Sequence, residues 1–181
     1  MFDSDLTITG TPATQIKFLV NEAHAFTRYI DVYMMGAVVG VLNGKTAQAG
    51  DSTDRARIYS DAFNTENVKC HEIFKLVILS DKLKDWTEQE RINICFRYRD
   101  KRDDLAVPPI TDEEVNSMKE AFDLFNSYVY GGIDIIYNNF ASDASADQND
   151  IVDYAYKAVF DQYSQTEVQA VNEDDLFRPE F

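Results

Sequence analysis

The sequence predicts an all-α fold, with one domain of about five or six helices over residues 1–163 and an acidic tail over 164–181 that we expect to be flexible. Two long stretches, 13–42 and 112–140, carry apolar residues at helical spacing. Two Thr-x-x-Glu capping boxes open further helices. A chain of 181 residues is long enough for one domain with a substantial core.

The first helix is expected over residues 13–42 as one continuous stripe. Its periodicity permits a break or a bend near Arg28 but does not require one. Asn43-Gly44 is interpreted as its C-terminal cap, with glycine in the left-handed conformation and Lys45 beside the last carbonyls. The stripe consists of apolar residues at positions 16, 19, 20, 23, 26, 30, 33, 34, 37, 38 and 41.

The Gly44-Lys45-Thr46 sequence resembles part of a phosphate-binding loop but departs from it in spacing and context. Three residues separate Gly40 from Gly44, whereas the motif has four between its two glycines. Val39 stands where the motif needs the first glycine. A phosphate loop opens a helix, whereas this segment closes one and faces its negative dipole end. We therefore expect neither a nucleotide nor any other cofactor.

The middle of the chain predicts a polar loop over 44–54, a short amphipathic turn or helix near 58–63, and a second strong helix that begins at Asn64-Thr65 and ends near Ser80-Asp81. Thr87 with Glu90 opens the next helix, which carries Ile92, Cys95 and Phe96. The residues expected to point inward from the second strong helix are Val68, Ile73, Phe74, Val77 and Ile78.

Thr111 with Glu114 opens the helix over 112–140, which Gly131-Gly132 interrupts at a cost of about 1 kcal/mol per glycine relative to alanine. Such a pair permits a kink or the close approach of another backbone. That backbone belongs either to this domain or to a partner's helix. On the second alternative, Tyr128, Gly131 and Gly132 are candidate partner-binding residues. A last helix is expected over 151–163.

The net charge of −15 and pI near 4.4 argue against nonspecific binding to nucleic acid and to anionic lipid. The longest nearly apolar run is Val32–Leu42. It is too short to cross a bilayer, which takes about 20 residues. The acidic start lacks a signal peptide's basic region. We expect a soluble cytoplasmic protein. The basic run Arg97–Arg102 is interpreted as a mixed-charge helix end, with contact to a phosphate backbone as the alternative.

The titratable residues do not predict a catalytic or metal site. Cys70 and Cys95 lie in apolar helical patterns and are expected to be buried thiols. With His24 and His71 they form no pair at zinc-ligand spacing, and neighbouring side chains such as Cys70 and His71 diverge on a helix. The sequence therefore predicts a non-enzymatic protein without a bound metal.

Two non-enzymatic classes remain: a subunit or adaptor of a larger assembly, and an acidic DNA mimic that inhibits a nucleic-acid-binding protein. From Asp143 onward there are 10 acidic and 2 basic residues, so much of the negative charge lies outside the predicted helical core. A mimic needs carboxylates dense over one folded face, and this distribution favours the adaptor. Leu176, Phe177 and Phe181 in the acidic tail are candidate anchors for a partner with a basic, partly apolar groove.

Several short stretches resemble small helical accessory components of bacterial anti-phage defence operons. The resemblance is to phosphorothioation-associated components and to the small middle components of three-gene systems with an SMC-like ATPase and an effector nuclease. It implies a cytoplasmic, non-catalytic bridging subunit of a defence complex, with an ATPase or nuclease subunit as protein partner, and it transfers no catalytic residue. The similar stretches are Arg28–Tyr33, Gly36–Gly40, Glu90–Ile92, Phe96–Tyr98 and Phe125–Ile133.

Overall fold

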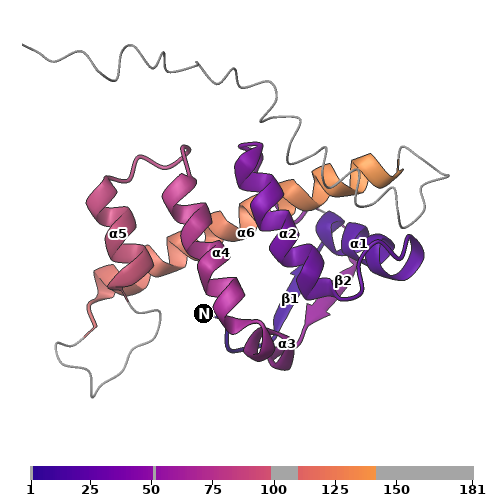
Figure 1. The fold of residues 1–181 in the computed structure, drawn as a ribbon, viewed down its shortest axis with the longest axis horizontal. Helices are drawn as coiled ribbons and strands as arrows, with labels where there is room; N and C mark the ends of the chain where they lie inside the picture. The colour runs from indigo at the N-terminus through magenta and orange to yellow at the C-terminus, as the bar shows by residue number, and fades with distance from the viewer. Residues whose placement is uncertain (1, 51, 99–109, 142–181) are drawn as a thin grey trace, which may run out of the picture.

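The computed structural model describes residues 2–50, 52–98 and 110–141, which form a mostly helical fold with one small sheet (Figure 1). The helix expected over 151–163 and the tail over 164–181 lie outside the described residues. The elements in chain order are β1 (Leu6–Thr9), α1 (Thr11–Lys17), the π-helical segment η1 (Phe18–Glu22), α2 (Tyr29–Leu42), β2 (Arg55–Ile58), α3 (Ser60–Thr65), α4 (Asn67–Ser80), α5 (Glu88–Phe96) and α6 (Asp112–Ala141).

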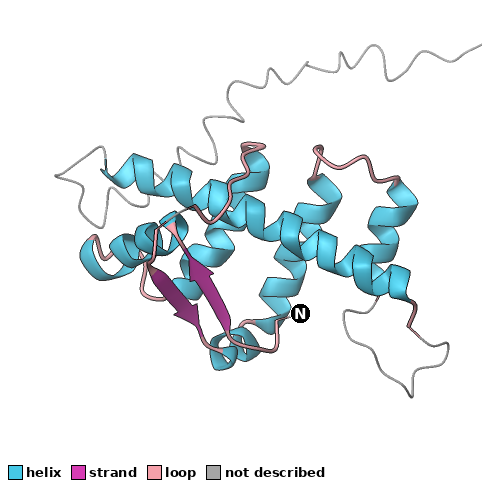
Figure 2. Cartoon of the chain, turned by 180° about the vertical axis from the view of Figure 1, so that it is seen from behind, coloured by secondary structure: helices cyan, strands magenta, loops and turns pink. Residues whose placement is uncertain are grey.

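The two-stranded sheet corrects the all-α prediction. β1 and β2 pair antiparallel, with Leu6 opposite Ile58 and Thr9 opposite Arg55 (Figure 2). Ile8, Ala56 and Ile58 are buried, while their immediate neighbours within each strand are exposed. This is the two-residue alternation of a half-buried strand, but it lasts only four residues in each strand. So short a pattern is readily taken for a polar terminus and a loop, and only the pairing of distant segments reveals it.

The stretch expected as one continuous helix over 13–42 is divided, because the chain breaks after η1, next to Arg28, where the periodicity permitted a break. Residues 23–28 form an irregular connection in which His24 adopts a φ of 51°. The amide of Ala25 donates to the carbonyl of Leu19 at 2.8 Å, which closes the wide turn at the end of η1. An apolar stripe can belong to two helices that face the same core, so the periodicity alone did not reveal the break.

Helix α6 runs the length of the fold, and α2 crosses it closely (Figure 1). Glycines line the crossing: a Cβ built on Gly36 would lie 2.8 Å from the carbonyl oxygen of Val129, and one on Gly132 would lie 2.6 Å from the amide nitrogen of Gly40. These positions leave no room for a side chain, so the two backbones touch directly. The helix predicted over 112–140 is confirmed as α6, and its glycine pair serves internal packing.

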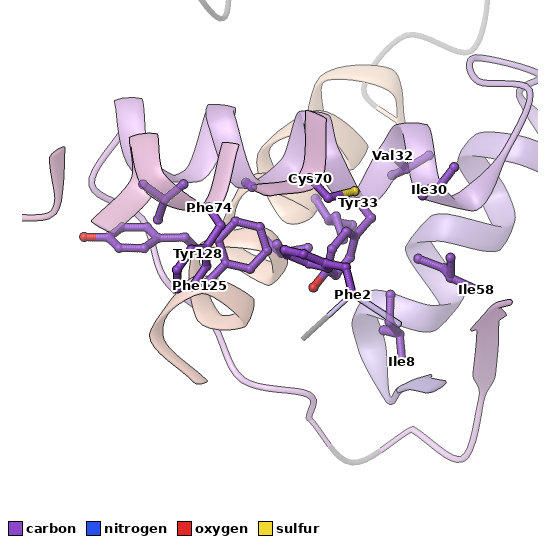
Figure 3. Packing of buried hydrophobic residues seen from close by; sticks show 14 of the residues in the cluster. Phe2, Ile8, Ile30, Val32, Tyr33, Ile58, Cys70, Phe74, Phe125 and Tyr128 are labelled. Atoms are coloured by element: carbon purple, nitrogen blue, oxygen red, sulfur yellow. The ribbon is translucent and has the colours of Figure 1, made fainter. Parts of the chain in front are cut away.

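A cluster of aromatic rings fills the space between α2, α4 and α6 (Figure 3). Phe2 is 1% exposed and packs against five rings from α3, α4 and α6, including Phe63 at 5.6 Å and His71 at 5.2 Å between ring centroids. Tyr33 is fully buried, and its hydroxyl donates to the side-chain oxygen of Asn126 at 2.7 Å. Burial of these large rings supplies most of the apolar stabilisation at the centre of the fold.

Helices α4 and α5 form a hairpin, here called the α4–α5 hairpin (residues 67–98), beside the first half of α6 (Figure 1). Thr87 and Glu90 form the predicted capping box of α5, and Thr111 and Glu114 exchange the same bonds at the start of α6. Among the described helices, none is long and apolar enough to cross a membrane.

The connection between α4 and α5 is fastened to α6 by the buried carboxylate of Asp81. This carboxylate accepts hydrogen bonds from the Tyr128 hydroxyl at 2.7 Å, from the Arg91 guanidinium at 3.1 Å, and from the amides of Leu83 and Lys84. Burial by itself raises the pKa of Asp81, but these hydrogen bonds lower it by more than burial raises it. The net shift of the pKa is therefore downward. The inner side of the hairpin is therefore held by a fully paired charge.

Candidate interaction surface

The Gly44-Lys45-Thr46 segment ends α2 as predicted. Gly44 has a φ of 58°, its amide donates to Val41, and the amide of Lys45 donates to Gly40, which together make a Schellman cap. The Lys45 ammonium lies 2.6 Å from the carboxylate of Asp134 on α6, rather than beside the last carbonyls of α2. The lysine thus joins two elements of the fold, and the structure gives it a partner other than a phosphate.

The absence of nucleotide binding stays a prediction with a direct measurement. A calorimetric titration of the protein with Mg-ATP should show no heat of binding, because this lysine and its loop are arranged as a helix end. Micromolar affinity that disappears in Lys45→Ala would contradict this interpretation of the loop.

Both cysteines are buried free thiols, as predicted. Burial raises the pKa of Cys70 and of Cys95 to about 11, so each thiol is protonated at neutral pH and a poor nucleophile. His71 packs edge-on against Phe2, and burial lowers its pKa. Within the described ranges, no group of three or more His, Cys, Asp or Glu side chains is placed to hold a metal ion.

An open cavity of about 310 Å³ lies between the loop after α2 and one side of α6. Its lining carries small and neutral polar side chains, with a single carboxylate from Asp123. Over the described residues, every buried side-chain nitrogen and oxygen has a hydrogen-bond partner, so none is left aimed at a ligand. The cavity is lined by Ala47, Gln48, Ala49, Asp123, Asn126, Ser127 and Tyr130.

The structure describes three of the six candidate partner-binding residues that the sequence suggested, and all three are covered. Tyr128 is 1% exposed and bound to Asp81, Gly131 lies against the backbone of Lys45, and Gly132 lies against α2. The surface of these three residues is therefore covered within the domain, which is the first of the two alternatives for the glycine pair. The other candidates, Leu176, Phe177 and Phe181, lie outside the described residues.

The sequence did not single out the surface that the structure exposes. Eight large apolar side chains in the described residues are at least 36% exposed, and six of them belong to the α4–α5 hairpin. We call these six the outer apolar face. It consists of Val68, Leu76, Leu79, Leu83, Ile92 and Phe96, with exposed fractions from 41% to 74%.

Contacts between the two helices show how part of this face is continuous. The Sγ of Cys95 lies 3.9 Å from the carbonyl of Lys75, and the Arg91 guanidinium donates to the carbonyl of Ile78 at 2.7 Å. These contacts set α4 and α5 antiparallel. The Lys75 ammonium then lies 5.3 Å from the centre of the Phe96 ring. Leu79 is one helical turn beyond Lys75, so Leu79 and Phe96 flank the same lysine.

The charge around the outer apolar face differs from that of the rest of the chain. The α4–α5 hairpin contains six Lys and Arg against five Asp and Glu, whereas α6 contains six acidic residues and one basic residue. Lys84 and Arg91 also stand over the ring of Trp86, at 5.7 and 5.8 Å from its centre. The hairpin thus offers apolar side chains among balanced charges in a strongly acidic protein.

The sequence prediction for α4 was right about Phe74, Val77 and Ile78, which are buried, but wrong about Val68, which is 74% exposed. Ile92 and Phe96 were expected on the apolar pattern of α5, and both are exposed as well. The available signal was an excess of apolar residues: α4 carries them on both sides, more than one core-facing stripe requires.

Comparison with protein-family models, with characterised proteins and with solved structures finds no match to this chain.

Proposed function

We propose that this protein is a non-enzymatic subunit that docks onto another protein through the outer apolar face of the α4–α5 hairpin. The single observation that carries the proposal is the exposure of six large apolar side chains on one helical hairpin. Large apolar side chains that are exposed together in this way on an otherwise polar surface mark protein interfaces. The arrangement also suits an interface in detail, since an exposed aromatic ring and Leu79 are set beside charged groups that can form a polar rim.

The kind of partner follows from the resemblance noted in the sequence. It supports a bridging role in a bacterial anti-phage defence complex, with an SMC-like ATPase or an effector nuclease as the partner. The acidic tail over 164–181, with Phe177 and Phe181, serves in this proposal as a second anchor. In the described residues the geometry favours docking over chemistry, because the thiols are protonated and the polar groups of the core are already paired.

Affinity purification from the native host tests the proposal. The bait is the full chain, compared with the double variant Leu79→Gln/Phe96→Gln, whose glutamines keep the helix propensity of the two positions. The matched control is Tyr59→Gln, because Tyr59 is 61% exposed but lies away from the hairpin, between β2 and α3. We expect the wild-type chain and the control to retain an ATPase or nuclease subunit. The double variant should retain at least tenfold less of that subunit.

A salt series separates this proposal from the DNA mimic. An interface made of apolar burial persists at high salt, because salt screens exposed charges within about 8 Å at physiological ionic strength but does not screen apolar contacts. A mimic is released steeply by salt and displaced by duplex DNA. Equal retention of the partner by wild type and by the double variant would contradict docking through the outer apolar face.

A further inference from the structure

We infer that the outer apolar face of the α4–α5 hairpin is covered, in the free protein, by the acidic tail of the same chain, through Leu176, Phe177 and Phe181. This inference rests on the proposed function, since it assigns an occupant to the same face before a partner arrives. The partner then has to displace the tail from the hairpin, and binding becomes a competition between two occupants of one surface.

The chemistry of the two surfaces is complementary. Residues 164–181 contain five acidic side chains and one basic one, together with two phenylalanines and a leucine. Among the described elements, α6 contains six acidic residues and one basic residue, so it repels such a segment. The hairpin is nearly balanced in charge and presents Lys75 beside Phe96 and Lys84 beside Trp86. The hairpin therefore combines exposed apolar side chains with cations that an acidic segment with aromatic anchors can contact.

The connecting chain is long enough to reach. Lys84 of the hairpin lies 3.7 Å from Glu120, so the hairpin sits about 30 Å along α6 from Ala141, at about 1.5 Å per residue. About 34 residues separate Ala141 from Leu176 and could span about 110 Å when extended. Even if residues 151–163 form the helix that the sequence predicts, the remaining length exceeds the distance about threefold.

A second copy of the chain is the competing occupant, and charge disfavours it. Two molecules of net charge −15 repel each other at low salt, whereas docking of the tail onto its own hairpin brings no second molecule of that charge close. Tethering also raises the effective concentration of the tail at the face without any new contact. The intramolecular arrangement is thus the one that the length and charge of the chain favour.

Paramagnetic relaxation in the full chain tests the inference without any partner. A spin label is attached to a cysteine introduced by Gln169→Cys, upstream of the three anchors, because Cys70 and Cys95 are buried and shielded from the reagent. We expect amide signals of residues 76–83 and 92–97 to lose at least fivefold in intensity, while those of β1 and β2 change little. Wild-type protein treated with the same reagent is the control for labelling of the native thiols.

Two sets of substitutions in the labelled chain decide the outcome. Phe177→Ser/Phe181→Ser and, separately, Leu79→Gln/Phe96→Gln should each restore the signals of the hairpin. Persistence of the broadening in either variant, or broadening spread evenly over the described domain, would overturn the inference.

Mixing spin-labelled chain with isotope-labelled, spin-free chain separates the two sources of the occupant. Broadening of the hairpin in that mixture shows docking of a second copy and overturns the intramolecular assignment. Failure of the partner purification, with the tail still on the hairpin, would refute the proposed function alone. Capture of the partner by a chain whose tail never contacts the hairpin would refute this inference alone.

Discussion

The crossing of α2 and α6 and the α4–α5 hairpin use their surfaces in opposite ways. At the crossing, Gly36, Gly40 and Gly132 remove side chains so that two backbones meet inside the fold. On the hairpin, large side chains such as Leu79 and Phe96 extend from α4 and α5 into solvent. The first region is complete within the chain, because any added atom must displace backbone. The second leaves apolar surface exposed, which is the feature on which the proposed docking rests.

The hairpin itself shows the same contrast between its two sides. Its inner side holds the Asp81 carboxylate with four hydrogen-bond donors and the buried ring of Phe74. Its outer side carries the outer apolar face. Substitutions should therefore affect folding on the inner side and binding on the outer side.

Among polar residues, the largest effect on stability is expected from Asp81→Ala. Loss of the buried carboxylate leaves the half-buried Arg91 guanidinium and the Tyr128 hydroxyl without their shared acceptor, and removing one partner of such a pair typically costs about 3–5 kcal/mol. Urea unfolding at pH 7 measures the loss. Asp85→Ala is the matched control, since Asp85 lies exposed in the same loop, and it should change stability by less than about 0.5 kcal/mol. Equal losses would show that Asp81 does not fasten the hairpin.

Gly132→Ala should cost about 1–3 kcal/mol, because its Cβ would collide with the backbone of Gly36 and Gly40 and force the two helices apart. Gly44→Ala is the comparison: it has open space around it and pays only for its positive φ, about 1 kcal/mol. Both values come from urea unfolding. A smaller loss at Gly132 than at Gly44 would contradict direct backbone contact at the crossing.

The pH dependence of stability should carry a contribution from Asp81. Since its folded pKa lies below its ordinary value, its contribution is fully present above the unfolded pKa of about 3.8 and is lost as the pH falls through the folded pKa. Urea unfolding of wild type and of Asp81→Asn between pH 7 and pH 3 isolates it. The variant should show a shallower fall in stability below pH 4, by at most about 1.4 kcal/mol per pH unit. If the stability of wild type and variant falls in parallel with pH, Asp81 does not contribute to the acid dependence of stability.

The smallest effect on stability is expected on the outer face of the hairpin. Leu79→Gln and Phe96→Gln should each cost at most about 1 kcal/mol, because Leu79 is already 46% exposed and Phe96 62% exposed. Phe74→Ala on the inner side of the same helix should cost about 3–5 kcal/mol. Thermal and urea unfolding of the three variants provide the test. A loss at Leu79 or Phe96 that matches the loss at Phe74 would mean that the outer face is part of the core.

Local signals in the sequence predicted the features that depend on a few neighbouring residues. The capping boxes at Thr87 and Thr111 and the Schellman cap at Gly44 formed as expected, since each is closed by residues within five positions of one another. The burial of Cys70 and Cys95 also followed from their place in apolar helical patterns.

Features that join distant segments were decided only by the tertiary structure. The pairing of Leu6–Thr9 with Arg55–Ile58 brings together strands too short to be recognised singly. The break after η1 and the direction of Val68 follow from which neighbours already fill the core. A helical period shows which residues share a face, but a helix with apolar residues on two faces, such as α4, is ambiguous by itself. Packing against α6 selects the face that is buried, and the other face is left exposed.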